Sequence, residues 1–182
     1  MGNPINNTMY TDQENTWAAQ MAYCNITLDI IEATETEFDV DEPTFNQIVQ
    51  YCNIANKNIW YDNTSNNQHD FLTNAATSEY GNWKIVSVCD QNTENGLYAM
   101  AIETGNYTRN NVNNGLILSV RGSEPTASQA FLDYVETDAN FLNSDITAQE
   151  QALYQYIDGE LSDLMRKKHY SNLATTGHSL IR

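Results

Sequence analysis

Near its end the sequence carries a serine in a setting that favours nucleophilic chemistry. A short apolar stretch at 173–176 is followed directly by Gly177, His178 and Ser179. A serine on a tight turn after a buried strand can present its hydroxyl to an acyl carbon, and small residues two places before and after it let the turn close. Gly177 supplies the first small residue, whereas Ile181 occupies the second position. The tripeptide alone is weakly specific, so its context must decide between a nucleophile and an incidental turn.

A second motif carries groups that could stabilise an oxyanion. The apolar run at 115–120 is typical of a strand covered on both faces, and Arg121, Gly122 and Ser123 follow it. Acyl transfer needs N–H or hydroxyl donors aimed at the negative oxygen that develops on the substrate. The stretch between Ser123 and Ser179 is long enough for the helices of a crossover connection. Both motifs would then lie at the C-terminal ends of neighbouring strands, where ligands bind in such sheets.

The rest of the pattern predicts the elements that must position these motifs. Apolar residues at three- and four-residue steps predict a helix over 13–33 capped by Asp12, and a second helix over 43–58 with Pro43 in its first turn. A short helix over 70–79 has a weaker pattern. The later elements are strands over 83–90 and 96–104 as a hairpin, a strand over 115–120, helices over 126–143 and 147–168, and a strand over 172–176. This succession is an α/β pattern.

The two motifs, in this order and at this spacing, resemble the N-terminal half of a class 3 lipase-like α/β hydrolase. The resemblance covers about residues 83–180 and depends on the sequences VRGSEP and GHSL. It implies an α/β-hydrolase-like fold, in which a helical N-terminal part (1–80) leads into a partial mixed sheet with crossover helices (81–182). The 182 residues would then be a single incomplete domain, truncated after the nucleophile elbow.

The resemblance also implies roles for individual residues. Ser179 matches the nucleophile, Ser123 the oxyanion-hole residue, and Leu180 a second oxyanion donor through its backbone N–H. His178 matches a structural histidine of the elbow. Arg121 would hold the oxyanion loop by hydrogen bonds across the sheet's edge, and a plain salt bridge is the alternative for this residue. The implied function is that of a serine ester hydrolase acting on lipid or other acyl esters.

The partners that such a serine needs are not evident in the sequence. In the family an Asp or Glu and then a His follow the serine, whereas only Leu, Ile and Arg follow Ser179 here. His69 and His169 precede it, in a polar loop and at a predicted helix end. Without a base the hydroxyl stays protonated, so these residues alone are expected to be nearly inert. The alternative function is a non-catalytic binding protein that retains the lipase-like scaffold.

A truncated sheet would expose an apolar edge formed by the strands at 115–120 and 172–176. Such an edge predicts pairing with a complementary C-terminal fragment, or self-association. The other expected partner is the lipid or acyl-ester substrate.

Composition and charge exclude several other classes. A net charge of −16 argues against nucleic acid as a partner, and the basic cluster at 166–169 is interpreted as the last turn of a helix. No metal or cofactor is predicted, because the three histidines and Cys24, Cys52 and Cys89 lack metal-ligand spacing. Cys24 and Cys52 are interpreted as buried thiols, with a disulfide between them as the alternative.

No apolar run approaches the roughly 18 residues of a transmembrane segment. The first residues also lack the basic and apolar stretches of a secretory signal. The default expectation is therefore a cytoplasmic protein, and signal-independent secretion is the alternative.

Overall fold

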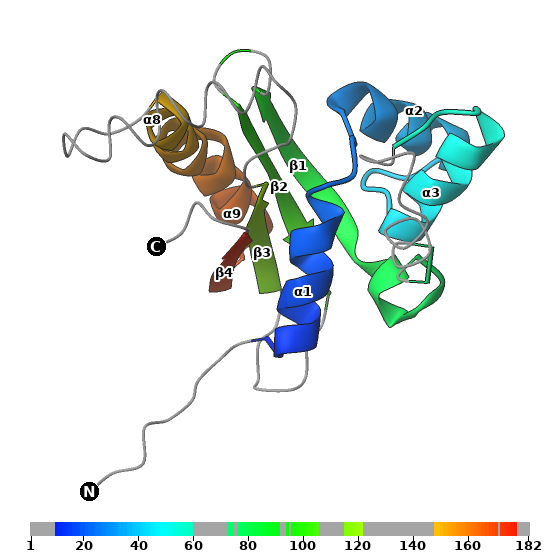
Figure 1. Cartoon of the computed structure of the whole chain (residues 1–182), viewed down its shortest axis with the longest axis horizontal. Helices are drawn as coiled ribbons and strands as arrows, with labels where there is room; N and C mark the ends of the chain where they lie inside the picture. Colours follow the sequence, from blue (N-terminus) through cyan, green and yellow to red (C-terminus); the bar gives the residue numbers. More distant parts are fainter. Residues whose placement is uncertain are drawn as a thin grey trace, which may run out of the picture.

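The structure is a computed structural model, and it describes residues 10–59, 73–74, 76–91, 94, 96–105, 115–121, 148–170 and 172–177. A four-stranded mixed sheet lies between helices (Figure 1). The helices are α1 (Asp12–Met21), α2 (Leu28–Phe38), α3 (Phe45–Ile54), α8 (Ala148–Tyr156) and α9 (Ser162–Lys168), and the strands are β1 (Lys84–Gln91), β2 (Leu97–Glu103), β3 (Gly115–Val120) and β4 (Asn172–Gly177). The predicted mixture of helices and a mixed sheet is confirmed, whereas the helix expected over 126–143 lies outside the described residues.

The order of the strands in the sheet is β1-β2-β3-β4. β1 and β2 form the predicted antiparallel hairpin, β2 and β3 are also antiparallel, and β3 and β4 are parallel. All six residues of β3 are buried, as its continuous apolar sequence predicts. β4 contacts β3 on one side, and its residues are half-buried or exposed.

The N-terminal helix expected over 13–33 is wrong as a single element, because α1 ends at Met21 and α2 begins at Leu28. Thr27 starts α2 as its N-cap, and its hydroxyl accepts a hydrogen bond from the N–H of Ile30. The cap of α1 is Thr11 rather than Asp12. Thr11 and Glu14 form a capping box, in which each side chain accepts from the other residue's backbone N–H.

The second predicted helix, over 43–58, is shorter at both ends. α3 begins at Phe45 after the N-cap Thr44, so Pro43 lies outside the helix. The carbonyl of Pro43 accepts from the backbone N–H of Ile85, at 3.3 Å, and this bond joins the helical part to β1.

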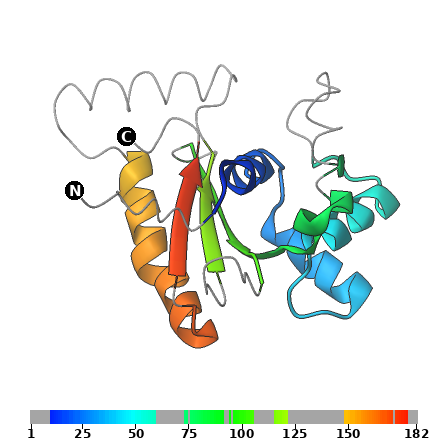
Figure 2. The same cartoon turned by 90° about the horizontal axis from the view of Figure 1, so that it is seen from below.

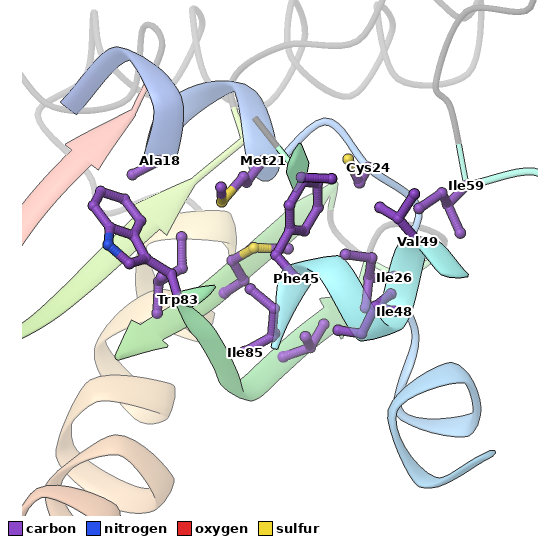
Figure 3. Close-up of a cluster of buried hydrophobic side chains, with 14 of the residues drawn as sticks. Ala18, Met21, Cys24, Ile26, Phe45, Ile48, Val49, Ile59, Trp83 and Ile85 are labelled. Atoms are coloured by element: carbon purple, nitrogen blue, oxygen red, sulfur yellow. The ribbon is translucent and has the colours of Figure 1, made fainter. Parts of the chain in front are cut away.

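Two apolar clusters cover the two faces of the sheet. α1, α2 and α3 share one cluster with residues of the sheet, and Figure 3 shows Phe45 of α3 among these side chains, beside Met21 and Ile85. α8 and α9 share the other cluster with the opposite face, which includes Val120. In Figure 2 the sheet is seen between α1 on one side and the α8–α9 helix on the other. The helical N-terminal part is therefore packed onto the sheet as one core.

The helix predicted over 147–168 is present as α8 and α9, joined without a break by a π-helical turn over Ile157–Leu161. The basic residues Arg166, Lys167 and Lys168 occupy its last turn, as predicted, and His169 follows in the left-handed conformation as C-cap.

Glu42 joins the end of this helix to the helical part. Its carboxylate lies 2.6 Å from Nζ of Lys168 and 3.4 Å from Nζ of Lys84. Burial by itself would raise the pKa of Glu42, but the hydrogen bonds and charges of the two lysines outweigh burial and lower the pKa. The carboxylate is therefore better stabilised in the folded state than in the unfolded chain.

Replacement of Glu42 should remove a pH-dependent part of the stability. A carboxyl whose folded pKa is lowered stabilises the fold above its unfolded pKa and loses this effect as the pH falls through the folded pKa. We expect Glu42→Gln to lower the free energy of unfolding by about 0.5–1 kcal/mol at pH 7, and the difference from wild type to be smaller at pH 3. Urea unfolding at the two pH values measures this, with the exposed Glu37→Gln on α2 as control. An equal loss at both pH values would contradict the prediction.

Candidate active site at the ends of β3 and β4

The register of the sheet brings Arg121 and Gly177, the first residue of each motif, to one edge. Ala99 of β2, Val120 of β3 and Gly177 of β4 lie opposite one another in a row. Because β3 and β4 are parallel, the chain leaves both strands at this edge, directly before the RGS and HS residues. This is the edge at which ligands bind in open α/β sheets.

Gly177 is required by the close approach of β3 and β4. A Cβ atom added at this position would lie 2.6 Å from the carbonyl oxygen of Val120. Only a residue without a side chain therefore fits at the end of β4 while this register is kept. The lack of room for a Cβ atom explains why a glycine stands at the first position of the GHS sequence.

Gly177→Ala should consequently destabilise the fold by roughly 1–3 kcal/mol, because the clash is with main-chain atoms. Chemical denaturation followed by circular dichroism measures this loss. Gly159→Ala is the matched control, since an added Cβ there meets no atom within 4 Å. In a helix this exchange should be neutral or stabilising by up to about 1 kcal/mol. Equal stability of Gly177→Ala and wild type would show that the two strands separate at little cost.

Arg121, the first residue after β3, is buried with only 1% of its surface exposed. Its Nε donates to the carbonyl of Ala22 at 2.7 Å, and its Nη2 donates to the carbonyl of Cys24 at 3.1 Å and to Oδ1 of Asn25 at 3.3 Å. These bonds run to the connection between α1 and α2, rather than across the sheet's edge as expected. The bond to Ala22 also gives a partner to the carbonyl of the residue that caps the C-terminal end of α1.

The side chain of Tyr98, in β2, also contacts Arg121. The guanidinium carbon lies 3.9 Å from the centre of the Tyr98 ring, a cation–π arrangement. The Tyr98 hydroxyl donates to the carbonyl of Ile26 at 2.7 Å. Burial raises the pKa of Tyr98, and the charge of Arg121 opposes this effect without cancelling it. The phenol is therefore a hydrogen-bond donor at neutral pH.

Two further hydrogen bonds fix α1 over the same part of the sheet. Ser119 of β3 donates through its hydroxyl to the carbonyl of Ala18 at 2.8 Å. Thr176 of β4 donates in the same way to the carbonyl of Asn15 at 3.3 Å. These bonds attach α1 to both strands that carry the motifs, near their C-terminal ends.

Ser123, Ser179 and Leu180, the predicted site residues, lie outside the described residues, as do Gly122 and His178. Their roles stay predictions. Sequence reasoning missed Tyr98 and the α1–α2 connection as neighbours of the site. Nothing in the local pattern around Tyr98 marks it, since it lies in an ordinary apolar strand.

The described histidine does not lie at this edge. His169 precedes β4 and therefore lies at the opposite end of the strand from Gly177. The expectation that His169 is not the base for Ser179 stays a prediction, because Ser179 lies outside the described residues. His69 lies outside the described residues.

The described cysteines are buried and free, so the disulfide alternative for Cys24 and Cys52 is not realised. Burial raises the pKa of Cys89 to about 11, and the carboxylates of Glu160, Asp90 and Glu94 add to this effect. Within the described part of the chain no group of three or more metal-ligating side chains occurs.

Ser87 forms a polar contact between β1 and the α8–α9 helix. Its hydroxyl lies 2.7 Å from the Tyr156 hydroxyl and donates to Glu160 at 2.5 Å.

A hollow of about 160 Å³ lies at the C-terminal end of α3 and is lined by residues 52, 53 and 56–58. Arg121 and Gly177 do not line it. None of the described helices is long and apolar enough to cross a membrane.

In comparisons with known proteins, no family model, curated protein or solved structure matches the chain.

Proposed function

We propose that the chain is the N-terminal portion of a serine ester hydrolase with an α/β-hydrolase-like fold, which acts on lipid or other acyl esters. Ser179 is the nucleophile, and Ser123 and the backbone N–H of Leu180 form the oxyanion hole. The observation that carries the proposal is the parallel pairing of β3 and β4 with Val120 opposite Gly177. It brings Arg121 and Gly177, the first residue of each motif, to one edge of the sheet.

Three further features support the proposal. The close approach of β4 to β3 at Gly177 is compatible only with glycine, the residue that a tight serine turn requires two places before the nucleophile. Arg121 fixes the start of the loop that carries Ser123 by three hydrogen bonds. The mixed sheet, with helices on both faces, is the type of scaffold in which this arrangement of motifs occurs.

The chemistry follows from the roles of these groups. The Oγ of Ser179 attacks the ester carbonyl and forms a tetrahedral intermediate, whose negative oxygen accepts hydrogen bonds from the oxyanion donors. Collapse of the intermediate expels the alcohol and leaves an acyl-serine, which water hydrolyses. A base must take the serine proton and return it to the leaving alcohol, and in the family this base follows the serine in the chain.

A fluorophosphonate probe tests the proposal directly, because it phosphonylates serines that a neighbouring base activates. The assay uses the product of the complete reading frame, so that any residues encoded after Arg182 are present. Trypsin cleavage after Lys168 gives a peptide from His169 to Arg182 that contains both Ser171 and Ser179. We expect mass spectrometry to find the label on Ser179, and heat-denatured protein to stay unlabelled.

Absence of label on Ser179, in protein shown to be folded, would overturn the hydrolase proposal. It would favour the alternative of a non-catalytic binding protein with the same scaffold. Label on Ser171 in place of Ser179 would refute the assignment of the nucleophile.

A further inference from the structure

The contacts of Tyr98 extend the candidate site to the connection between α1 and α2, residues 22–27. We propose that Tyr98 is a positioning residue: together with Arg121 it holds the start of the loop after β3 against this connection, and thereby sets the rate at which Ser179 reacts. This inference rests on the proposed function.

Tyr98 holds Arg121 with both its main chain and its side chain. The backbone N–H of Arg121 donates to the Tyr98 carbonyl at 2.9 Å, which continues the β2–β3 ladder one residue past β3. The guanidinium lies over the Tyr98 ring at 3.9 Å. Arg121 is therefore held both by its backbone and by the guanidinium at the end of its side chain.

The same two side chains also fix the α1–α2 connection. Arg121 donates to the carbonyls of Ala22 and Cys24, and Tyr98 donates to the carbonyl of Ile26. Tyr98 is 99% buried, with 1% of its surface exposed, so solvent cannot easily replace its hydroxyl as the donor to Ile26. The connection and the start of the loop thus share a single set of hydrogen bonds.

This sharing has a consequence for reactivity. Ser123 lies two residues after Arg121 in the chain. The rate of acyl transfer is sensitive to small displacements of positioned groups, and a shift of about 1 Å can cost on the order of a hundredfold. A connection that loses its bond to Tyr98 gives Arg121 more freedom, and the oxyanion donors that follow lose precision.

Tyr98→Phe tests the proposal with a close control. It removes the hydroxyl and keeps the ring under Arg121. Tyr10→Phe is matched to it, because it removes another buried tyrosine hydroxyl, which bonds to Thr104 at 3.0 Å at the opposite end of β2. We expect both variants to lose similar thermal stability. Only Tyr98→Phe should lower the rate of fluorophosphonate labelling and kcat for a short-chain ester, by about tenfold, with KM nearly unchanged.

Asn25→Ala provides a second variant that is expected to fold, because Asn25 is exposed. It removes the Oδ1 atom that accepts from Nη2 of Arg121, and it should lower the labelling rate by a smaller factor than Tyr98→Phe does. If Tyr98→Phe fails to fold, an unchanged labelling rate in Asn25→Ala overturns the inference.

The outcomes separate the inference from the function on which it rests. If wild type is labelled on Ser179 and Tyr98→Phe reacts as fast as Tyr10→Phe, the positioning role is overturned and the hydrolase proposal stands. If wild type is not labelled, the proposed function fails, and the positioning role fails with it.

Discussion

Ser179→Ala is expected to abolish fluorophosphonate labelling and to lower the rate of ester hydrolysis by about 10⁴-fold or more. The large size follows from the chemistry, because alanine offers no oxygen to form the acyl intermediate. The rate that remains would come from oxyanion stabilisation and substrate binding alone. KM should change little, since the lost interaction forms with the reacting carbonyl rather than with the bound ester. Steady-state kinetics with a chromogenic short-chain ester measures both quantities.

Ser162→Ala is the matched control, because it also replaces a serine by alanine, at an exposed position at the start of α9. It should keep wild-type labelling and activity. If Ser179→Ala keeps activity within about tenfold of wild type, the nucleophile lies elsewhere, since loss of a true nucleophile has a far larger effect.

Arg121→Met is expected to lower the free energy of unfolding by about 3–5 kcal/mol, the second large effect. Methionine keeps an unbranched apolar chain but donates no hydrogen bonds. The carbonyl of Ala22 would lose its charged donor, and an unsatisfied buried carbonyl costs about 1–3 kcal/mol. The carbonyl of Cys24 would also lose a charged donor, although it keeps the backbone N–H of Ile26. Loss of the cation–π contact with Tyr98 adds to this. For a protein of this size the midpoint of thermal unfolding should fall by about 10 °C.

Arg166→Met measures what the same chemical change costs at the surface. Arg166 pairs with Asp163 at 2.7 Å, and 77% of its side chain is exposed. Surface ion pairs contribute about 0–1 kcal/mol, so this variant should unfold close to wild type. Equal effects of the two substitutions would mean that Arg121 is not essential for anchoring the α1–α2 connection.

The sheet could be predicted from the sequence because its strands carry local signals. Alternation over 83–90, the turn before Gly96 and the continuous apolar run of β3 each mark a strand within a few residues. The parallel pairing of β3 and β4 followed from topology, since a long connection with helical patterns joins two apolar strands.

The break between α1 and α2 could not be predicted in the same way. Apolar residues continue at helical spacing through Cys24 and Leu28, so the local pattern favours one helix. The chain after α1 is held by Arg121, which lies 99 positions after Ala22 and donates to the carbonyl of this C-cap residue. A contact with a residue so far along the chain cannot be predicted from the local spacing of apolar residues.

Part of the candidate site could be predicted from the sequence and part could not, for the same reason. The motifs at Arg121 and Gly177 could be recognised from residue types and order, and the register of β3 and β4 brings the ends of their strands together. The role of Tyr98 could not be recognised, because it depends on which side chains meet after folding. The bonding of Arg121 to the connection, in place of the expected contact across the sheet's edge, has the same cause.

The hydrogen bond from Thr176 to Asn15 joins residues that are 161 positions apart. During synthesis α1 leaves the ribosome early, whereas β4 leaves it only when nearly all of these residues have been made. Until then the apolar side of α1 lacks one of the two strands that it contacts, and contacts between such distant segments form slowly. That apolar side of α1 consequently stays incompletely covered until β4 has been made, and we expect chaperones that bind exposed apolar segments to bind the nascent chain in this interval.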